Sequence, residues 1–209
     1  GFVSPAITLD GTSYRKQASE TMKKEYEQYA GDADKLKALF QKGLDELGIT
    51  DKPEDITITL LSQGSATENQ LEREYLQQSI SQNLGVKVEL NTVGDYQMFA
   101  NERDNKNYDI FVGGWFSDYN DPLDFLNDSY GLYSNSEYDS LIDSLTGEND
   151  NAKRLEIYQK LEDLLVAQDC GVAPLYYSDK HYYYQNWVKD FYTSSFGASQ
   201  ELYRASVQK

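Results

Sequence analysis

The sequence is poor in the residues that build disulfide and metal frameworks. Its 209 residues include one cysteine, Cys170, and one histidine, His181. A single cysteine excludes a disulfide within the chain and a cysteine-rich zinc site, and a single histidine excludes a site made of several histidines. No hydrophobic run approaches the ~18 residues that a membrane-spanning helix needs.

Positive charge is also scarce. The chain has 19 Lys and Arg against 35 Asp and Glu, so its formal net charge is −16. Such a charge repels phosphate backbones, which excludes nucleic acid as the main partner. The first residues contain no Met and no apolar signal segment, so we expect either a removed signal or a piece of a longer protein. Aromatic residues make up 13 %, with 18 tyrosines, and favour a folded chain over a disordered one.

Strand and helix patterns alternate through the middle of the chain. Alternating apolar residues predict the first two strands, and a run that reads as buried predicts the third. Apolar residues at helical spacing predict the first helix, and a capping box of Thr67 and Gln70 predicts the second. This order is typical of βαβ units, so the predicted fold class is α/β with a mostly parallel sheet flanked by helices. The strands are predicted over 56–60, 86–90 and 108–112, and the helices over 34–47, 67–83 and 95–103.

The remaining segments are less regular. Residues 1–16 are predicted to be irregular, and residues 170–177 are predicted to form a strand broken by Pro174. Cys170 is expected to be packed, because apolar residues follow it. Three further helices are predicted over 121–128, 136–146 and 151–168, the last with an apolar face of Leu155, Tyr158, Leu161, Leu164 and Leu165.

The strongest candidate site follows the last predicted strand. Gly113 and Gly114 end the strand, and Trp115, Phe116 and Asp118 come directly after them. Ligands of open α/β sheets bind beyond the carboxyl ends of the strands. A carboxylate beside flat aromatic rings suits a ligand that carries an amine. The alternative is a plain strand-to-helix turn, in which Asp118 and Asp121 cap the helix and Trp115 lies in the core.

Other chemistry finds little support in the sequence. The acidic cluster around Asp118 and Asp124, which also contains Asn120 and Asp121, lacks the spacing of a calcium loop. Pairs such as Asp118 and Asp121 would suit a glycoside hydrolase, but acidic pairs abound in this chain. No phosphate-binding loop, dinucleotide fingerprint or nucleophile elbow is present, and no cofactor is expected. The aromatic C-terminal region is either a stacking surface for sugars or peptides, or packing.

One stretch resembles a known family. Residues 114–126 fit the pattern G-W-x-x-D-Y-x-[DE]-P-x-x-F-L of the solute-binding proteins of oligopeptide ABC importers, family 5. Residues 133–142, YSNSEYDSLI, and residues 172–177, VAPLYY, resemble later stretches of the same family, as do Arg154, Tyr158 and Glu162 of the last helix. The resemblance spans nearly the whole chain.

The resemblance implies a lobe of a type II periplasmic-binding-protein-like fold. Family members close two lobes over a peptide, and this chain resembles only the C-terminal one. Residues 1–173 are expected to form that lobe, and residues 174–209 to return to an absent N-terminal lobe of the same protein. The implied partners are an oligopeptide ligand and the membrane permease of an ABC importer. The implied location is the periplasm, or the extracellular face of the membrane with a lipid anchor, and no catalysis is implied.

The resemblance also implies roles for individual residues. The family's amine anchor falls on Asp118 and its neighbouring tryptophan on Trp115. Gly114 and Phe116 match positions whose backbone groups pair with the peptide, and an aromatic contact falls near Tyr96. Val112 stands where some members carry a basic residue for the peptide carboxylate, and Arg103 is a candidate substitute. The open alternatives are a carbohydrate-binding lobe of the same architecture and a glycoside hydrolase.

Overall fold

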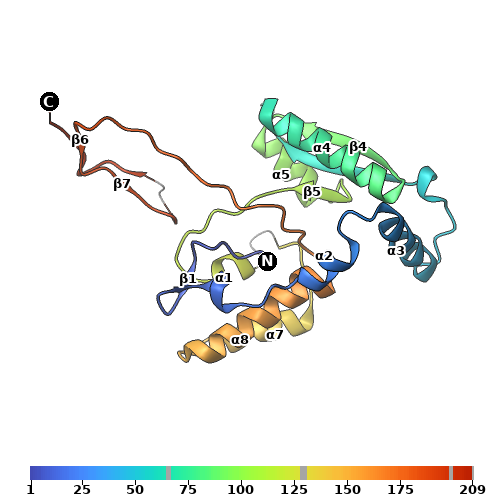
Figure 1. Ribbon diagram of the computed structural model, residues 1–209, viewed down its shortest axis with the longest axis horizontal. Helices are drawn as coiled ribbons and strands as arrows, with labels where there is room; N and C mark the ends of the chain where they lie inside the picture. The colour runs from blue at the N-terminus through green and yellow to red at the C-terminus, as the bar shows by residue number, and fades with distance from the viewer. Residues whose placement is uncertain (65–66, 128–130, 198–199, 209) are drawn as a thin grey trace. The chain divides into compact units, whose positions relative to one another are not determined.

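The computed structural model describes residues 1–64, 67–127, 131–197 and 200–208 (Figure 1). The chain divides into two compact units. The first unit combines Gly1–Lys24 with Trp115–Lys209, and the second unit is Glu25–Gly114. Among the described residues, every helix falls short of the length or apolar character required to cross a bilayer.

The second unit contains a three-stranded parallel sheet. Strand β3 (Thr57–Gln63) lies in the middle, between β4 (Lys87–Val93) and β5 (Ile110–Val112). Leu60 of β3 pairs in register with Leu90 of β4 and Ile110 of β5. Helices α4 (Thr67–Leu84) and α5 (Tyr96–Asp104) connect the parallel strands. The α/β prediction with a parallel sheet is therefore confirmed, and so is the order of its elements.

Alternation along β3 gives the sheet two apolar faces. Leu60 belongs to a buried cluster with Val86 and Val88, against which apolar residues of α4 and of α3 (Ala33–Glu46) pack. The next residue, Leu61, faces the other way and is in register with Phe111. The ring of Phe99 in α5 meets the ring of Phe111 edge-on, with centroids 6.1 Å apart. Helices thus pack against both faces of the sheet.

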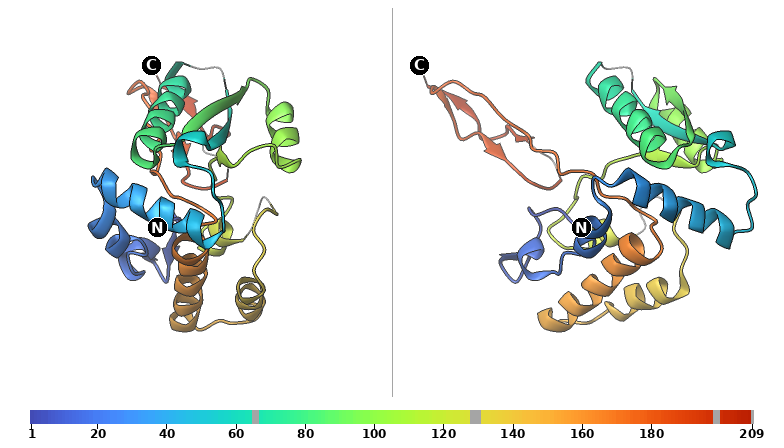
Figure 2. Two further views of the ribbon diagram at one scale, coloured as in Figure 1. Left: turned by 90° about the vertical axis from the view of Figure 1, so that its right-hand side faces the viewer. Right: turned by 45° about the vertical axis from the view of Figure 1, so that its right-hand side comes forward.

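The first unit is mainly helical and carries the larger core. Helices α7 and α8 pack side by side (Figure 2), and α8 continues into a π-helical stretch, η2. The apolar face predicted for residues 151–168 is confirmed, because Tyr158, Leu161, Leu164 and Leu165 are buried in this core. The elements of the unit are β1 (Thr8–Leu9), β2 (Thr12–Ser13), α1 (Tyr14–Gln17), α6 (Leu123–Leu126), α7 (Ser136–Ser144), α8 (Asn151–Glu162) and η2 (Asp163–Gln168). Helix α2 (Lys23–Tyr29) and the short η1 (Pro53–Asp55) lie outside these two cores.

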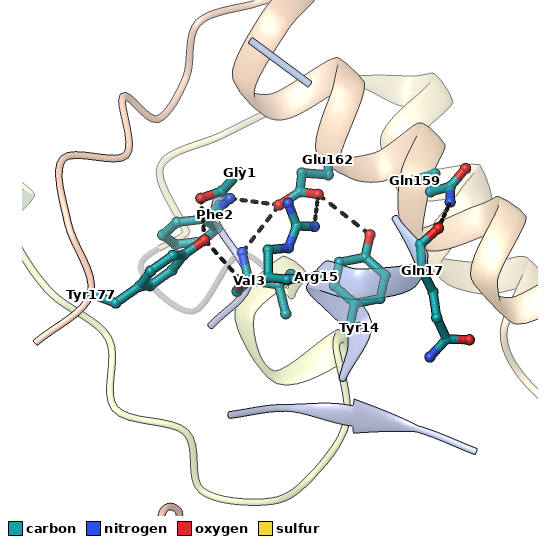
Figure 3. Close-up of polar contacts among 9 residues, drawn as sticks. All are labelled: Gly1, Phe2, Val3, Tyr14, Arg15, Gln17, Gln159, Glu162 and Tyr177. Carbon is teal, nitrogen blue, oxygen red and sulfur yellow. Dashed lines mark hydrogen bonds and ion pairs between the residues drawn. The ribbon is translucent and has the colours of Figure 1, made fainter. Parts of the chain in front are cut away.

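One buried carboxylate ties the start of the chain to α8. Glu162 is 1 % exposed, and its Oε1 accepts hydrogen bonds from the backbone N–H groups of Phe2, at 2.5 Å, and Val3, at 3.1 Å (Figure 3). Its Oε2 forms an ion pair with Arg15 and accepts a hydrogen bond from the Tyr14 hydroxyl. Burial, followed by the charge of Glu162, raises the pKa of Tyr14 well above its usual range, so this phenol stays a donor.

Three local predictions are wrong. Residues 1–16 are not irregular throughout, because Asp10 and Gly11, with φ angles of 53° and 71°, turn the chain between the antiparallel strands β1 and β2. Residues 170–177 do not form a strand, because no neighbouring strand shares their backbone hydrogen bonds. Cys170 is exposed rather than packed, since it turns the chain away from the helix end with a φ of 51°.

The tail forms two small antiparallel ribbons. Strand β6 (Val188–Lys189) pairs with β9 (Ser206–Val207), and β7 (Tyr192–Thr193) pairs with β8 (Gln200–Glu201). Two described residues of the tail contact the first unit's core and its N-terminal segment. Phe196 packs against the apolar core, and the Tyr177 hydroxyl lies within hydrogen-bond distance of the carbonyls of Gly1, at 2.7 Å, and Val3, at 3.0 Å.

The Glu162 network predicts a large effect of one substitution. Glu162→Ala removes the acceptor of two backbone N–H groups and leaves the mostly buried Arg15 charge without its partner. We expect the free energy of unfolding to fall by about 3–5 kcal/mol, measured by urea denaturation. Glu156→Ala, an exposed position on the same helix, is the control and should change stability by less than about 0.5 kcal/mol. Equal effects of the two substitutions would contradict the role of the network.

Candidate functional site

The predicted site residues Trp115, Phe116 and Asp118 lie on one loop of the first unit, between β5 and α6. Asp118 and Phe116 are exposed, and Trp115 is half-buried. Across the described ranges, no hydrogen bond or ion pair engages the Asp118 carboxylate. The prediction that Asp118 could be a helix cap is therefore wrong, and its carboxylate faces solvent as an available acceptor.

A second carboxylate supports this loop from within. Asp124, in α6, is 5 % exposed. Its Oδ2 accepts a hydrogen bond from the backbone N–H of Asp118 at 2.9 Å, and another from the indole Nε1–H of Trp115 at 3.3 Å. One buried oxygen thus holds the backbone of Asp118 and the ring of Trp115. Spacing along the sequence did not reveal this, because any of several nearby acids fits the same pattern.

Asp121 holds the first residue of α6. Its Oδ1 accepts a hydrogen bond from the backbone N–H of Leu123 at 2.9 Å and from the Tyr158 hydroxyl at 2.7 Å. Its Oδ2 pairs with Arg154 Nη2 at 2.5 Å. Burial, followed by the hydrogen bond to Asp121, raises the pKa of Tyr158 above its usual range. Because Asp121 is fully engaged, it does not form a free acid pair with Asp118 of the kind that a glycoside hydrolase needs.

The loop is also held by segments distant in sequence. The Asn120 side chain accepts a hydrogen bond from the backbone N–H of Thr8 at 2.8 Å and donates one to the Thr8 hydroxyl at 2.7 Å. From the tail, the backbone N–H of Gly197 donates to the carbonyl of Ser117 at 2.8 Å. These contacts make the loop a defined surface, and nothing in the local sequence predicted them.

The structure adds a cation that the sequence analysis missed. The ammonium of Lys180 lies 3.8 Å from the centroid of the Phe116 ring. A cation over an aromatic face is attracted by the electrons of the ring. The contact shows that this part of the loop accepts positive charge. No local pattern signals it, because 64 residues separate the two partners.

The other predicted site residues belong to the second unit. Tyr96 is the exposed first residue of α5, where Asp95 caps the helix. Arg103 pairs with Asp104 at 2.8 Å and also interacts with the Tyr96 hydroxyl. Val112 ends β5 half-buried, and Gly114 is exposed and joins the two units. Within this unit, therefore, Tyr96 and Arg103 are brought together.

No metal or cofactor site stands out in the described part of the chain. No group of three or more His, Cys, Asp or Glu residues is arranged there to hold a metal ion. In the acidic cluster, Asp121 and Asp124 bind groups of the protein itself, which leaves Asp118 as the acid with an available carboxylate.

Known proteins that resemble this chain are solute-binding proteins. The family model described as "Bacterial extracellular solute-binding proteins, family 5 Middle" matches residues 3–137. The chain is 29 % identical over 168 residues to the oligopeptide-binding protein OppA of Bacillus subtilis, an alignment that covers 76 % of this chain.

Solved structures share the fold. The substrate-binding domain of an oligopeptide ABC transporter from Bacillus anthracis superposes with a TM-score of 0.77 at 26 % identity, over 99 % of this chain. Listeria monocytogenes OppA bound to peptide superposes with a TM-score of 0.76 at 24 % identity, also over 99 % of this chain. The predicted lobe of a periplasmic-binding-protein-like α/β fold is confirmed by these superpositions.

The chain is much shorter than these relatives. It spans 29 % of the length of the Bacillus subtilis protein and 39 % of the Bacillus anthracis chain. The family match nevertheless covers well over half of the chain, from the first strand through the candidate loop to the start of α7. The chain therefore belongs to the bacterial extracellular solute-binding proteins of family 5.

Proposed function

We propose that this chain is the C-terminal lobe of an extracytoplasmic receptor that captures oligopeptides for an ABC importer. The observation that carries the proposal is the exposed Asp118 carboxylate, which no described group of the protein engages, on a loop that is otherwise held by hydrogen bonds. The similarity to oligopeptide-binding proteins supports peptide as the ligand class. The protein binds and releases its ligand without chemical change.

Asp118 binds the ammonium group at the N-terminus of the peptide. A charge-assisted hydrogen bond between a carboxylate and an ammonium contributes about 1.5–3 kcal/mol, more than a neutral hydrogen bond does. Trp115 and Phe116 add flat apolar surface beside it. The position of the Lys180 ammonium on Phe116 supports the affinity of this surface for cations. Gly114, Val112 and Tyr96 are proposed as further peptide contacts.

The peptide is enclosed by a partner lobe. The chain spans 39 % of the length of the similar Bacillus anthracis chain, which supports a receptor larger than this chain. We place residues 174–209 against the absent N-terminal lobe of the same protein. Their exposed aromatics support this role, since Tyr183 is 96 % exposed and Tyr203 is 75 % exposed. The complete receptor docks on the membrane permease, either lipid-anchored on the outer face of the membrane or free in the periplasm.

The tail assignment predicts a difference in hydrogen exchange. Backbone amides of residues 182–187, which precede the paired strands of the tail, should exchange quickly in the 209-residue chain and slowly in the longer, two-lobed protein, because the second lobe would cover them. Mass spectrometry of both proteins measures this, with β3 as the internal reference that should exchange slowly in each. Equal exchange rates of these amides in the two proteins would contradict the assignment of the tail to the N-terminal lobe.

The amine anchor predicts a selective effect of Asp118→Asn. We expect the Kd for trialanine to rise about tenfold, which corresponds to about 1.4 kcal/mol, while the Kd for N-acetyl-trialanine stays within twofold. An NMR titration of the 209-residue chain measures both, since it detects millimolar binding, and the two-lobed protein repeats it at higher affinity.

Asp143→Asn is the matched control, because it removes the same charge from an exposed position in α7. It should leave both affinities unchanged. Equal weakening of both peptides by Asp118→Asn would refute the amine anchor. Binding of a neutral oligosaccharide in place of both peptides would identify a carbohydrate-binding lobe, and hydrolysis of that sugar would identify an enzyme.

The anchor also predicts a pH dependence. The α-amino group of a peptide has a pKa near 8, so it loses its charge as pH rises from 7 to 9.5. Because only the ammonium form pairs with Asp118, the affinity for trialanine should fall toward that for N-acetyl-trialanine, whose affinity should stay constant. Titrations at four pH values check this, and parallel curves for the two peptides would contradict it.

A further inference from the structure

The stability of its own helix does not explain why the Asp124 carboxylate is buried. Asp124 lies in α6, a helix of four residues whose first backbone N–H, that of Leu123, already donates to Asp121. Its carboxylate instead accepts hydrogen bonds from two groups earlier in the chain, the backbone N–H of Asp118 and the indole N–H of Trp115. No ion pair with Asp124 occurs among the described residues. Burying a carboxylate without a cation is costly, so its hydrogen bonds must stabilise something specific.

The two donors converge on one atom. Oδ2 of Asp124 lies 2.9 Å from the backbone nitrogen of Asp118 and 3.3 Å from Nε1 of Trp115. The first bond restricts the backbone of Asp118, and therefore the direction in which its own carboxylate leaves the chain. The second bond restricts rotation of the indole about its side-chain torsions. The oxygen thus couples the carboxylate that faces solvent to the ring beside it.

We infer that Asp124 is a positioning residue that preorganises the amine-binding group Asp118 and the indole of Trp115. The inference rests on the proposed function for its ligand, and it assigns Asp124 no contact with the peptide. Groups held in the bound geometry before the ligand arrives lose less freedom on binding, which raises affinity. Asp124 therefore sets how strongly the receptor prefers a free amine over a blocked one.

The rest of the loop makes the effect separable from folding. The Asn120–Thr8 bonds and the Gly197–Ser117 bond hold the neighbouring backbone independently of Asp124. Asp121 holds the start of α6 through Arg154 and Tyr158. Loss of the Asp124 oxygen should therefore loosen Asp118 and Trp115 while the surrounding unit stays folded.

Two substitutions separate the acceptor from the charge. Asp124→Asn retains a carbonyl oxygen that can accept both hydrogen bonds and removes the negative charge. Asp124→Leu has a similar shape and no acceptor. Asp143→Leu, at an exposed position in α7, is the control for placing leucine where an acid stood. Each variant is titrated with trialanine and N-acetyl-trialanine, in the 209-residue chain and in the two-lobed protein.

The expected result is a selective loss in one variant. Asp124→Leu should raise the Kd for trialanine at least fivefold and that for N-acetyl-trialanine less than twofold. It should also shift the Trp115 indole N–H resonance and speed its hydrogen exchange, while the resonance of Trp187, the second tryptophan in the chain, stays in place. Asp124→Asn and Asp143→Leu should match the wild-type chain within twofold.

Three outcomes would overturn the inference. The first is an unchanged preference for the free amine in Asp124→Leu, and the second is an equal loss in Asp124→Leu and Asp124→Asn. The third is measured on the wild-type chain and so does not depend on the folding of a variant. Fast hydrogen exchange of the Trp115 indole N–H would show that its bond to Asp124 is not formed in solution.

Failure of the proposed function gives a different pattern. In that case Asp118→Asn leaves the discrimination between the two peptides unchanged, although the indole resonance still reports whether Asp124 holds Trp115. Suppose that Asp124→Leu shifts the indole N–H resonance of Trp115 while the wild-type chain shows no preference for the free amine. The hydrogen bond between Asp124 and Trp115 would then be real, but a peptide amine would not be the ligand. Such a result would overturn the positioning role, because that role is defined by the amine.

Discussion

The first unit depends on a carboxylate buried in its core. The unit is assembled from two segments separated by the whole second unit, and Glu162 joins them through the backbone N–H groups of Phe2 and Val3 and through Arg15. Glu162 is almost completely removed from water and the Arg15 side chain is 14 % exposed, so loss of the carboxylate leaves a mostly buried charge without its partner. The hairpin of β1 and β2, which follows the anchored segment, is then in place to hold Asn120 through Thr8.

Buried carboxylates also hold the candidate loop in place. Asp121 and Asp124 are turned inward, where Arg154, Tyr158, Trp115 and backbone N–H groups satisfy them. Asp118 is turned outward, and nothing among the described residues satisfies its carboxylate. A binding site for an ammonium group needs this division, because an acceptor already engaged by the protein has little to offer a ligand. The inward acids give the outward one a defined position.

Much of the architecture was predictable from local patterns. Alternating apolar residues located β3 and β4, and helical spacing located α3 and α8, since burial on one face leaves a periodic signal. A capping box located α4, and a short run that reads as buried located β5. The hairpin at residues 8–13 and the absence of a strand at 170–177 were not predictable in this way. A two-residue strand has no period, and an apolar stretch becomes a strand only if another strand is available to pair with it.

The sequence by itself determined the α/β order, the acidic character and the loop on which the candidate residues stand. It did not distinguish the roles of the aspartates in that loop, because they have the same side chain and lie in the same polar stretch. Tertiary structure decided which of them turns inward, since Arg154, Tyr158 and Thr8 reach the loop from 30 or more residues away. It also placed Lys180 on Phe116. Side chains acquire different roles when distant partners satisfy some of them and leave one facing water.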